Sequence, residues 1–71
     1  MTMDIHTPMG GKVIFRRANA GYPKDQETAE KHLRLGAVYT VGRTKPGKFH
    51  TDVYLEEVPG VAFNSVHFEN V

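Results

Sequence analysis

The residue types best suited to chemistry form two histidine–acid pairs. His50 and Asp52 are two residues apart, and so are His67 and Glu69. Alternate side chains of a β-strand share one face, so each pair would lie on one side of its strand. On neighbouring strands, the four groups would converge on a divalent cation. The alternative is that each pair decorates a solvated strand face or a turn. The spacing matches no established ligand motif, so we predict no metal and no other cofactor.

A nucleophilic site is the next possibility. Ser65 is the only serine, and the sequence has no cysteine. His67 follows it by two residues, but no third group is placed to orient the histidine as a base. A side-chain bond from Ser65 to the backbone of a turn is the competing interpretation. No glycine-rich phosphate loop is present either. We therefore expect a protein that is not an enzyme.

Basic residues flank two of the predicted segments. They are Lys12, Arg16 and Arg17 around the first strand, and Arg43, Lys45 and Lys48 around the first hairpin turn. In a barrel the two groups could merge into one patch, with Tyr22 or Tyr39 as a stacking surface for single-stranded nucleic acid. The alternative is an ordinary solvated surface, because the formal net charge is only +1 and nucleic-acid-binding domains are usually strongly basic.

A third set of residues predicts a protein-binding surface. Asp52, Tyr54 and Glu56 alternate with the apolar residues of the longest predicted strand and should face outward. Tyr22 and the helical segment would extend this face. Tyrosine suits interfaces because it offers a large rigid area with a polar tip. The competing interpretation is one exposed tyrosine between charges.

These residues would be positioned by short strands and one helix. The strands are predicted at 12–17, 37–43, 49–58, 61–63 and 66–68 from alternating apolar residues. A helix is predicted at 25–35, capped by Asp25, with Ala29 and Leu33 as its apolar stripe. Turns are expected at the two Pro-Gly pairs, 46–47 and 59–60. The expected core is Val13, Phe15, Leu33, Val38 or Tyr39, Val41, Val53, Leu55, Phe63, Val66 and Phe68.

Length and composition predict one small domain. The 71 residues suffice for a single modest core. Residues 1–11 read as a mobile or loosely docked tail, and 12–71 as the domain. No apolar run approaches the ~20 residues of a membrane span, and no signal-peptide core precedes the domain. With no cysteine, these features predict a cytoplasmic protein that does not enter a membrane.

Several tracts resemble small SH3-like β-barrel proteins of bacteriophages, prophages and other bacterial mobile elements. Leu33, Gly36, Tyr39 and Val41 match the spacing of a tract that opens the second strand after a long first loop. The segments 50–60 and 63–69 also resemble sequence segments of such proteins. The resemblance implies a 3₁₀ turn starting at 64–65, in which case His67 and Glu69 would not share a face.

The fold predicted is mostly β, a small SH3-like barrel of about five short strands with a short helix in the long first loop. The sequence lacks Trp and the Ala-Leu-Tyr-Asp-Tyr tract, so it departs from SH3 domains that bind proline-rich peptides. The function predicted is a non-enzymatic interaction module, a phage accessory protein that binds a host or phage protein. Nucleic-acid binding through the basic residues is the alternative, and self-association stays open.

Overall fold

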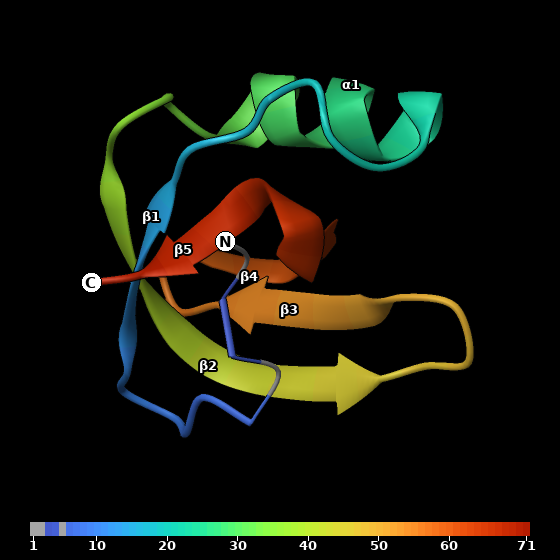
Figure 1. Cartoon of the computed structure of the whole chain (residues 1–71). Helices are drawn as coiled ribbons and strands as arrows, with labels where there is room; N and C mark the ends of the chain where they lie inside the picture. Colours follow the sequence, from blue (N-terminus) through green and yellow to red (C-terminus); the bar gives the residue numbers. More distant parts are fainter. Residues whose placement is uncertain (1–2, 5) are drawn as a thin grey trace.

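Five runs of alternating apolar and polar residues form one antiparallel sheet. The computed structural model describes residues 3–4 and 6–71. In chain order the elements are β1 (Lys12–Phe15), α1 (Pro23–His32), β2 (Val38–Pro46), β3 (Thr51–Leu55), β4 (Val58–Asn64), a 3₁₀ turn (Ser65–His67) and β5 (Phe68–Asn70) (Figure 1). The sheet is open, with strand order β4-β3-β2-β1-β5. The predicted mostly β class, with five short strands and a helix after the first, is confirmed.

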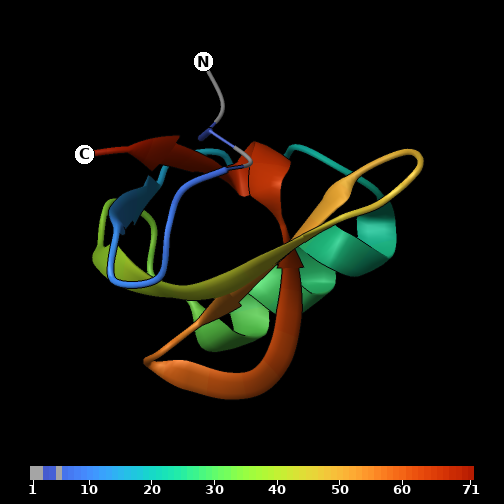
Figure 2. The same ribbon diagram turned by 90° about the horizontal axis from the view of Figure 1, so that it is seen from below.

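Strand β2 pairs with two neighbouring strands and bends between the two paired segments. Its first residues pair with β1, and the remainder, from Val41 to Pro46, pairs with β3. The register against β3 shifts between Val41 and Arg43, and a Cβ on the intervening Gly42 would lie 3.2 Å from the carbonyl oxygen of Tyr54. Glycine therefore lets β3 approach the bend closely. The long curved course of β2 is visible in Figure 2, and the molecule measures 27 × 27 × 25 Å, far from a flat sheet.

The first Pro-Gly pair is not the predicted turn. Pro46 is the last residue of β2, and the connecting loop spans 47–50. Gly47 does not have a positive φ. Its amide instead donates to the His50 carbonyl oxygen at 2.9 Å, and a Cβ there would lie 2.7 Å from that oxygen. Glycine is needed for this close approach, and the loop carries Phe49 at its tip rather than in a strand.

The second Pro-Gly pair is not a turn either. Leu55 pairs with Val58, so the two-residue turn between β3 and β4 is Glu56-Glu57. Pro59-Gly60 lies inside β4, at a register shift against β3. β4 is an edge strand, where proline is tolerated because one side of the strand needs no hydrogen bonds. Gly60 has φ of 81°, which only glycine adopts easily.

Helix α1 begins earlier and ends earlier than predicted. Its cap is Tyr22 rather than Asp25, and Pro23 takes the first helical position, where its fixed φ fits and no N–H is needed. The Asp25 carboxylate accepts from the Tyr22 amide at 3.3 Å. The backbone becomes extended at Leu33. Ala29 and Leu33 are buried as expected. No helix among the described residues is long and apolar enough to cross a membrane.

The core contains most of the predicted residues. It consists of Met3, Val13, Phe15, Ala29, Leu33, Val41, Val53, Leu55, Phe63 and Phe68. Val38 is exposed, and its alternative Tyr39 packs partly against the core. The prediction that Val66 belongs to the core is wrong, because the 3₁₀ turn rotates the backbone and directs His67 inward in its place. The His67 ring lies edge-on to Phe15, with ring centroids 5.7 Å apart.

The described part of segment 1–11 packs on the sheet. The Met3 amide donates to the Phe68 carbonyl oxygen at 2.7 Å, alongside β5. The Asp4 amide donates to the Asn70 side chain at 2.6 Å. Met3 is buried in the core. A buried methionine and the bonds to residues of β5 place Met3 and Asp4 on the domain, and the division into a tail at 1–11 and a domain at 12–71 stays a prediction. Residues 1, 2 and 5 of that prediction lie outside the described residues.

Candidate functional site

Side chains from two distant segments meet at the loop end of the β2–β3 hairpin. The Tyr22 ring, just before α1, contacts the His50 ring edge-on with centroids 6.0 Å apart. His50 Nε2 lies 3.1 Å from Asp52 Oδ1. The predicted pairing of His50 with Asp52 is therefore present, and Tyr22 extends it beyond the strand.

The same face continues along paired residues of β2 and β3. Arg43 is opposite Tyr54, and its guanidinium lies 4.3 Å from the centre of the Tyr54 ring. Lys45 is opposite Asp52. Because cross-strand partners project on the same side, these two pairs place two cations, one aromatic ring and one carboxylate on one surface. Asp52 and Tyr54 are half-buried, whereas Val53 and Leu55 are buried, so the predicted inward and outward faces are confirmed.

The hairpin loop adds an apolar side chain that sequence reasoning assigned to a strand. Phe49 is 83% exposed at the tip of the loop. Lys48 Nζ lies 5.9 Å from the centre of its ring. We call the surface formed by Tyr22, Arg43, Lys45, Lys48, Phe49, His50, Asp52 and Tyr54 the hairpin face.

The predicted protein-binding residues are mostly brought together. Tyr22, Asp52 and Tyr54 belong to the hairpin face. Glu56 lies at the other end of β3, exposed in the turn before β4. It is therefore at the margin of this surface rather than at its centre.

The predicted basic residues do not merge into one patch. The Phe15 amide donates to the Ala37 carbonyl oxygen, so Arg16 lies beside the start of β2. Arg43 is six residues further along that strand, about 20 Å at ~3.3 Å per residue. Arg17 Nη2 donates to Glu69 at 2.6 Å, and Arg16 Nε lies 3.8 Å from the same carboxylate. Only Arg43, Lys45 and Lys48 belong to the hairpin face.

Lys12 belongs to a separate network that sequence reasoning missed. Its Nζ donates to Thr40 Oγ1 at 2.5 Å. The Thr40 amide in turn donates to both carboxylate oxygens of Glu57, at 2.8 and 3.0 Å. Burial acts to raise the pKa of Glu57, but the Thr40 bonds and the Lys12 charge outweigh it and hold the pKa below its usual value. The network ties the β3–β4 turn to β1 and β2.

The second histidine–acid pair is separated by the fold. His67 is fully buried, and its Nδ1 donates to the Arg17 carbonyl oxygen at 2.6 Å. Glu69 is held outside by Arg17, whose bond lowers its pKa against the opposing effect of desolvation. The four groups considered as possible metal ligands therefore do not converge. No group of three or more potential metal-binding side chains occurs in residues 3–4 and 6–71.

Ser65 lies where the 3₁₀ turn begins, and it is buried. Its carbonyl oxygen accepts the Phe68 amide, and the preceding Asn64 side chain accepts the Val66 amide at 3.2 Å. The expected 3₁₀ turn before the last strand is confirmed. His67 points to the core rather than to Ser65, since its ring is packed against Phe15 and Phe68.

The fold and the hairpin face define a small antiparallel β protein with an exposed aromatic and basic surface. Residues 12–71 match the family model described as bacteriophage T4 protein Y07B. The chain therefore belongs to this family of phage proteins, and the expected phage origin is supported. The match begins at Lys12, the first residue of β1. Comparison with curated proteins and with solved structures gave no match.

Proposed function

We propose that this phage protein is a non-enzymatic accessory module that binds a host or phage protein through the hairpin face in the cytoplasm of the infected cell. Exposure of Phe49 at the tip of a hairpin is the observation that carries the proposal. A phenylalanine in solvent gains nothing for folding, whereas a partner would remove its whole ring from water. Tyr54 and Arg43, further along the same hairpin, are among the residue types that dominate binding energies at interfaces.

The exposed aromatic side chains at this end of the molecule support a protein partner. Tyr22 is 55% exposed and Phe49 83% exposed, and they flank His50 on the same end of the molecule. Aromatic anchors of this kind insert into pockets of the partner and are surrounded by polar groups that form the rim. On this surface Lys45 and Asp52 would supply such a rim.

Site-specific photo-crosslinking in infected cells tests the proposal. A photoreactive residue replaces Phe49, and in a matched control it replaces Glu30, which is exposed on α1. We expect one discrete protein adduct from position 49 and none from position 30, and Tyr54→Ala should weaken the adduct. A nuclease-treated sample is run in parallel. Equal labelling from both positions, or an adduct only with nucleic acid, would contradict the proposal.

Nucleic-acid binding remains the second candidate because of a specific feature of the same surface. Arg43 lies over the Tyr54 ring and Lys48 lies near the Phe49 ring, while Lys45 is opposite Asp52 on the same hairpin. Single strands are bound by such combinations of cations and stacking rings. Titration with a fluorescent oligonucleotide at two salt concentrations distinguishes the candidates. Three phosphate contacts predict a log–log salt slope of about −2, and charge reversal at Lys48 should reduce it.

We also propose that the open sheet belongs to the SH3-like barrel class. One strand before a long helical segment, tight hairpins after it and a 3₁₀ turn before the last strand support this assignment. The curved β2, shared between β1 and β3, supports it as well. An experimental structure would test it through the closure of the sheet around the core. Sedimentation of the purified protein would test self-association separately.

A further inference from the structure

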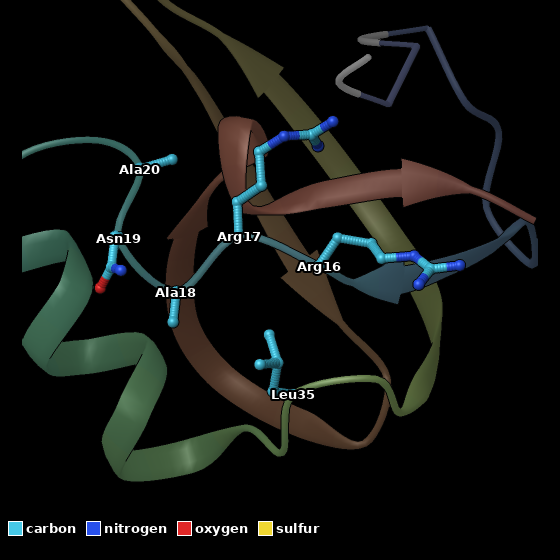
Figure 3. A pocket seen from close by; sticks show the side chains of 6 residues that line it. All are labelled: Arg16, Arg17, Ala18, Asn19, Ala20 and Leu35. Atoms are coloured by element: carbon cyan, nitrogen blue, oxygen red, sulfur yellow. The ribbon is translucent and has the colours of Figure 1, made fainter.

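A pocket lies on a different part of the molecule from the hairpin face. It is formed by the segment that leaves β1 and by the loop after α1, and its volume is about 410 Å³. Its lining residues are Arg16, Arg17, Ala18, Asn19, Ala20 and Leu35 (Figure 3). Pockets that bind ligands have volumes of roughly 300–1,000 Å³. The size is therefore sufficient for a side chain and its neighbouring backbone.

The floor of this pocket is apolar and held in place. Ala18 and Leu35 point toward one another in Figure 3, and Leu35 is 61% exposed. The loop that carries Leu35 is fixed to β1, because the Gly36 amide donates to the Phe15 carbonyl oxygen at 2.7 Å. Gly36 has φ of 86°, which turns the chain sharply after Leu35. A preorganised apolar floor lowers the entropy cost of binding.

The rim of the pocket carries excess positive charge. The side chains of Arg16 and Arg17 extend toward β5, where both guanidinium groups face the single Glu69 carboxylate. Arg17 Nη1 is buried and has no hydrogen-bond partner among the described residues. Arg16 is the more exposed of the two, at 57% of its side chain. Arg16 is thus available to a second carboxylate from outside.

We propose that this pocket binds a short acidic segment of a partner protein, with an aliphatic side chain on Leu35 and Ala18 and a neighbouring carboxylate on Arg16. Arginine and carboxylate form strong charge-assisted hydrogen bonds. Arg16 and Arg17 both lie beside the pocket, and their positive charge complements a carboxylate. None of the six lining residues is aromatic, so the pocket has no stacking surface for a base.

The test is a titration of ¹⁵N-labelled protein with the peptide acetyl-Gly-Leu-Asp-Gly-amide, followed by amide chemical shifts. We expect saturable shifts confined to residues 16–20 and 35–37. Replacing the peptide's Asp by Asn, or the protein's Arg16→Gln, should weaken binding about fivefold to tenfold, the loss expected for one charge-assisted bond. Leu35→Ser should weaken it as well. The unperturbed amides of each variant show that it remains folded.

Arg43→Gln on the hairpin face is the matched control and should leave the titration unchanged. Because the peptide is monitored at the pocket, a negative result here does not affect the crosslink from position 49, and the reverse also holds. Three outcomes overturn the proposal: no saturable shift, equal binding of the Asn peptide, or stronger shifts with inorganic phosphate than with the Asp peptide.

Discussion

The two histidine–acid pairs have the same spacing in sequence and opposite places in the molecule. His50 and Asp52 flank the start of β3, remain at the surface and contact each other at 3.1 Å. His67 ends the 3₁₀ turn in the core, and Glu69 lies outside on β5. Residues two apart share a face where the backbone is extended, as it is along a strand. The 3₁₀ turn breaks that period and makes one pair a surface feature and the other a core feature.

The largest expected difference between these regions is in the free energy of unfolding lost when a phenylalanine of each region is replaced by alanine. Phe68→Ala should lower the free energy of unfolding by about 3–5 kcal/mol, because the ring is fully buried. Phe49→Ala should change it by less than about 0.5 kcal/mol, as is usual for exposed positions. Urea melts of both variants measure the two values. A similar loss from both variants would mean that the hairpin tip packs against something in the free protein.

Alanine substitutions of the two histidines should also differ in the free energy of unfolding that they cost, by less than the two phenylalanine substitutions do. His67→Ala removes a buried ring and leaves the Arg17 carbonyl oxygen without its 2.6 Å bond. We expect a loss of about 2–4 kcal/mol. His50→Ala should cost less than about 0.5 kcal/mol, because its contact with Asp52 is exposed. Thermal melts of the two variants at neutral pH provide the comparison, and equal stabilities would refute the inward placement of His67.

The two glutamates of the β3–β4 turn allow a similar comparison. Glu57 accepts hydrogen bonds from the Thr40 amide, whereas Glu56 is exposed in the turn. The pKa of Glu57 is lowered in the folded protein, so its contribution to stability is present above the ordinary carboxyl pKa and is lost as pH falls through the folded value. Glu57→Gln should therefore destabilise the protein at pH 7 and make stability depend less on pH below ~4.3. Glu56→Gln is the matched control. Parallel pH profiles for the two variants would contradict this role of the Thr40 bonds.

A further expected effect, smaller than the losses from Phe68→Ala and His67→Ala, is the coupling between Arg43 and Tyr54. A double-mutant cycle with Arg43→Ala and Tyr54→Ala should give a coupling free energy of about 0.5–1 kcal/mol, typical of an exposed cation–π pair. High salt should change it little if stacking contributes most. A coupling indistinguishable from zero would mean that the two side chains are held independently and are free to reorganise on binding.

The strands and the core were predictable because local alternation determines them. Val53 and Leu55 are buried between outward neighbours, as their spacing predicts. The turns were not predictable from Pro-Gly pairs, because proline is also compatible with the edge strand β4 and with the end of β2 beyond the reach of β1. The turn at Glu56-Glu57 contains neither residue, and it depends on the tertiary bonds of Glu57 to Thr40.

The candidate site was predictable only where one element carried it. Asp52 and Tyr54 followed from the alternation within β3. The contact of Tyr22 with His50 joins segments that are distant in sequence, and it depends on how the loop before α1 returns to the hairpin. The separation of Arg16 from Arg43 depends on the register between β1 and β2. Such information is not contained in residue spacing along one segment.

The pairing of Phe15 with Phe68 has a consequence for the order of events during synthesis. A ribosome that adds ~5–20 residues per second takes roughly 3–10 s to reach Phe68 after Phe15. Throughout that interval β1 has no β5 beside it, while β2, β3 and β4 can pair as they emerge because they are consecutive. Pairing between consecutive strands can therefore precede the synthesis of β5, whereas the pairing of β1 with β5 must wait until residues 68–70 have been made.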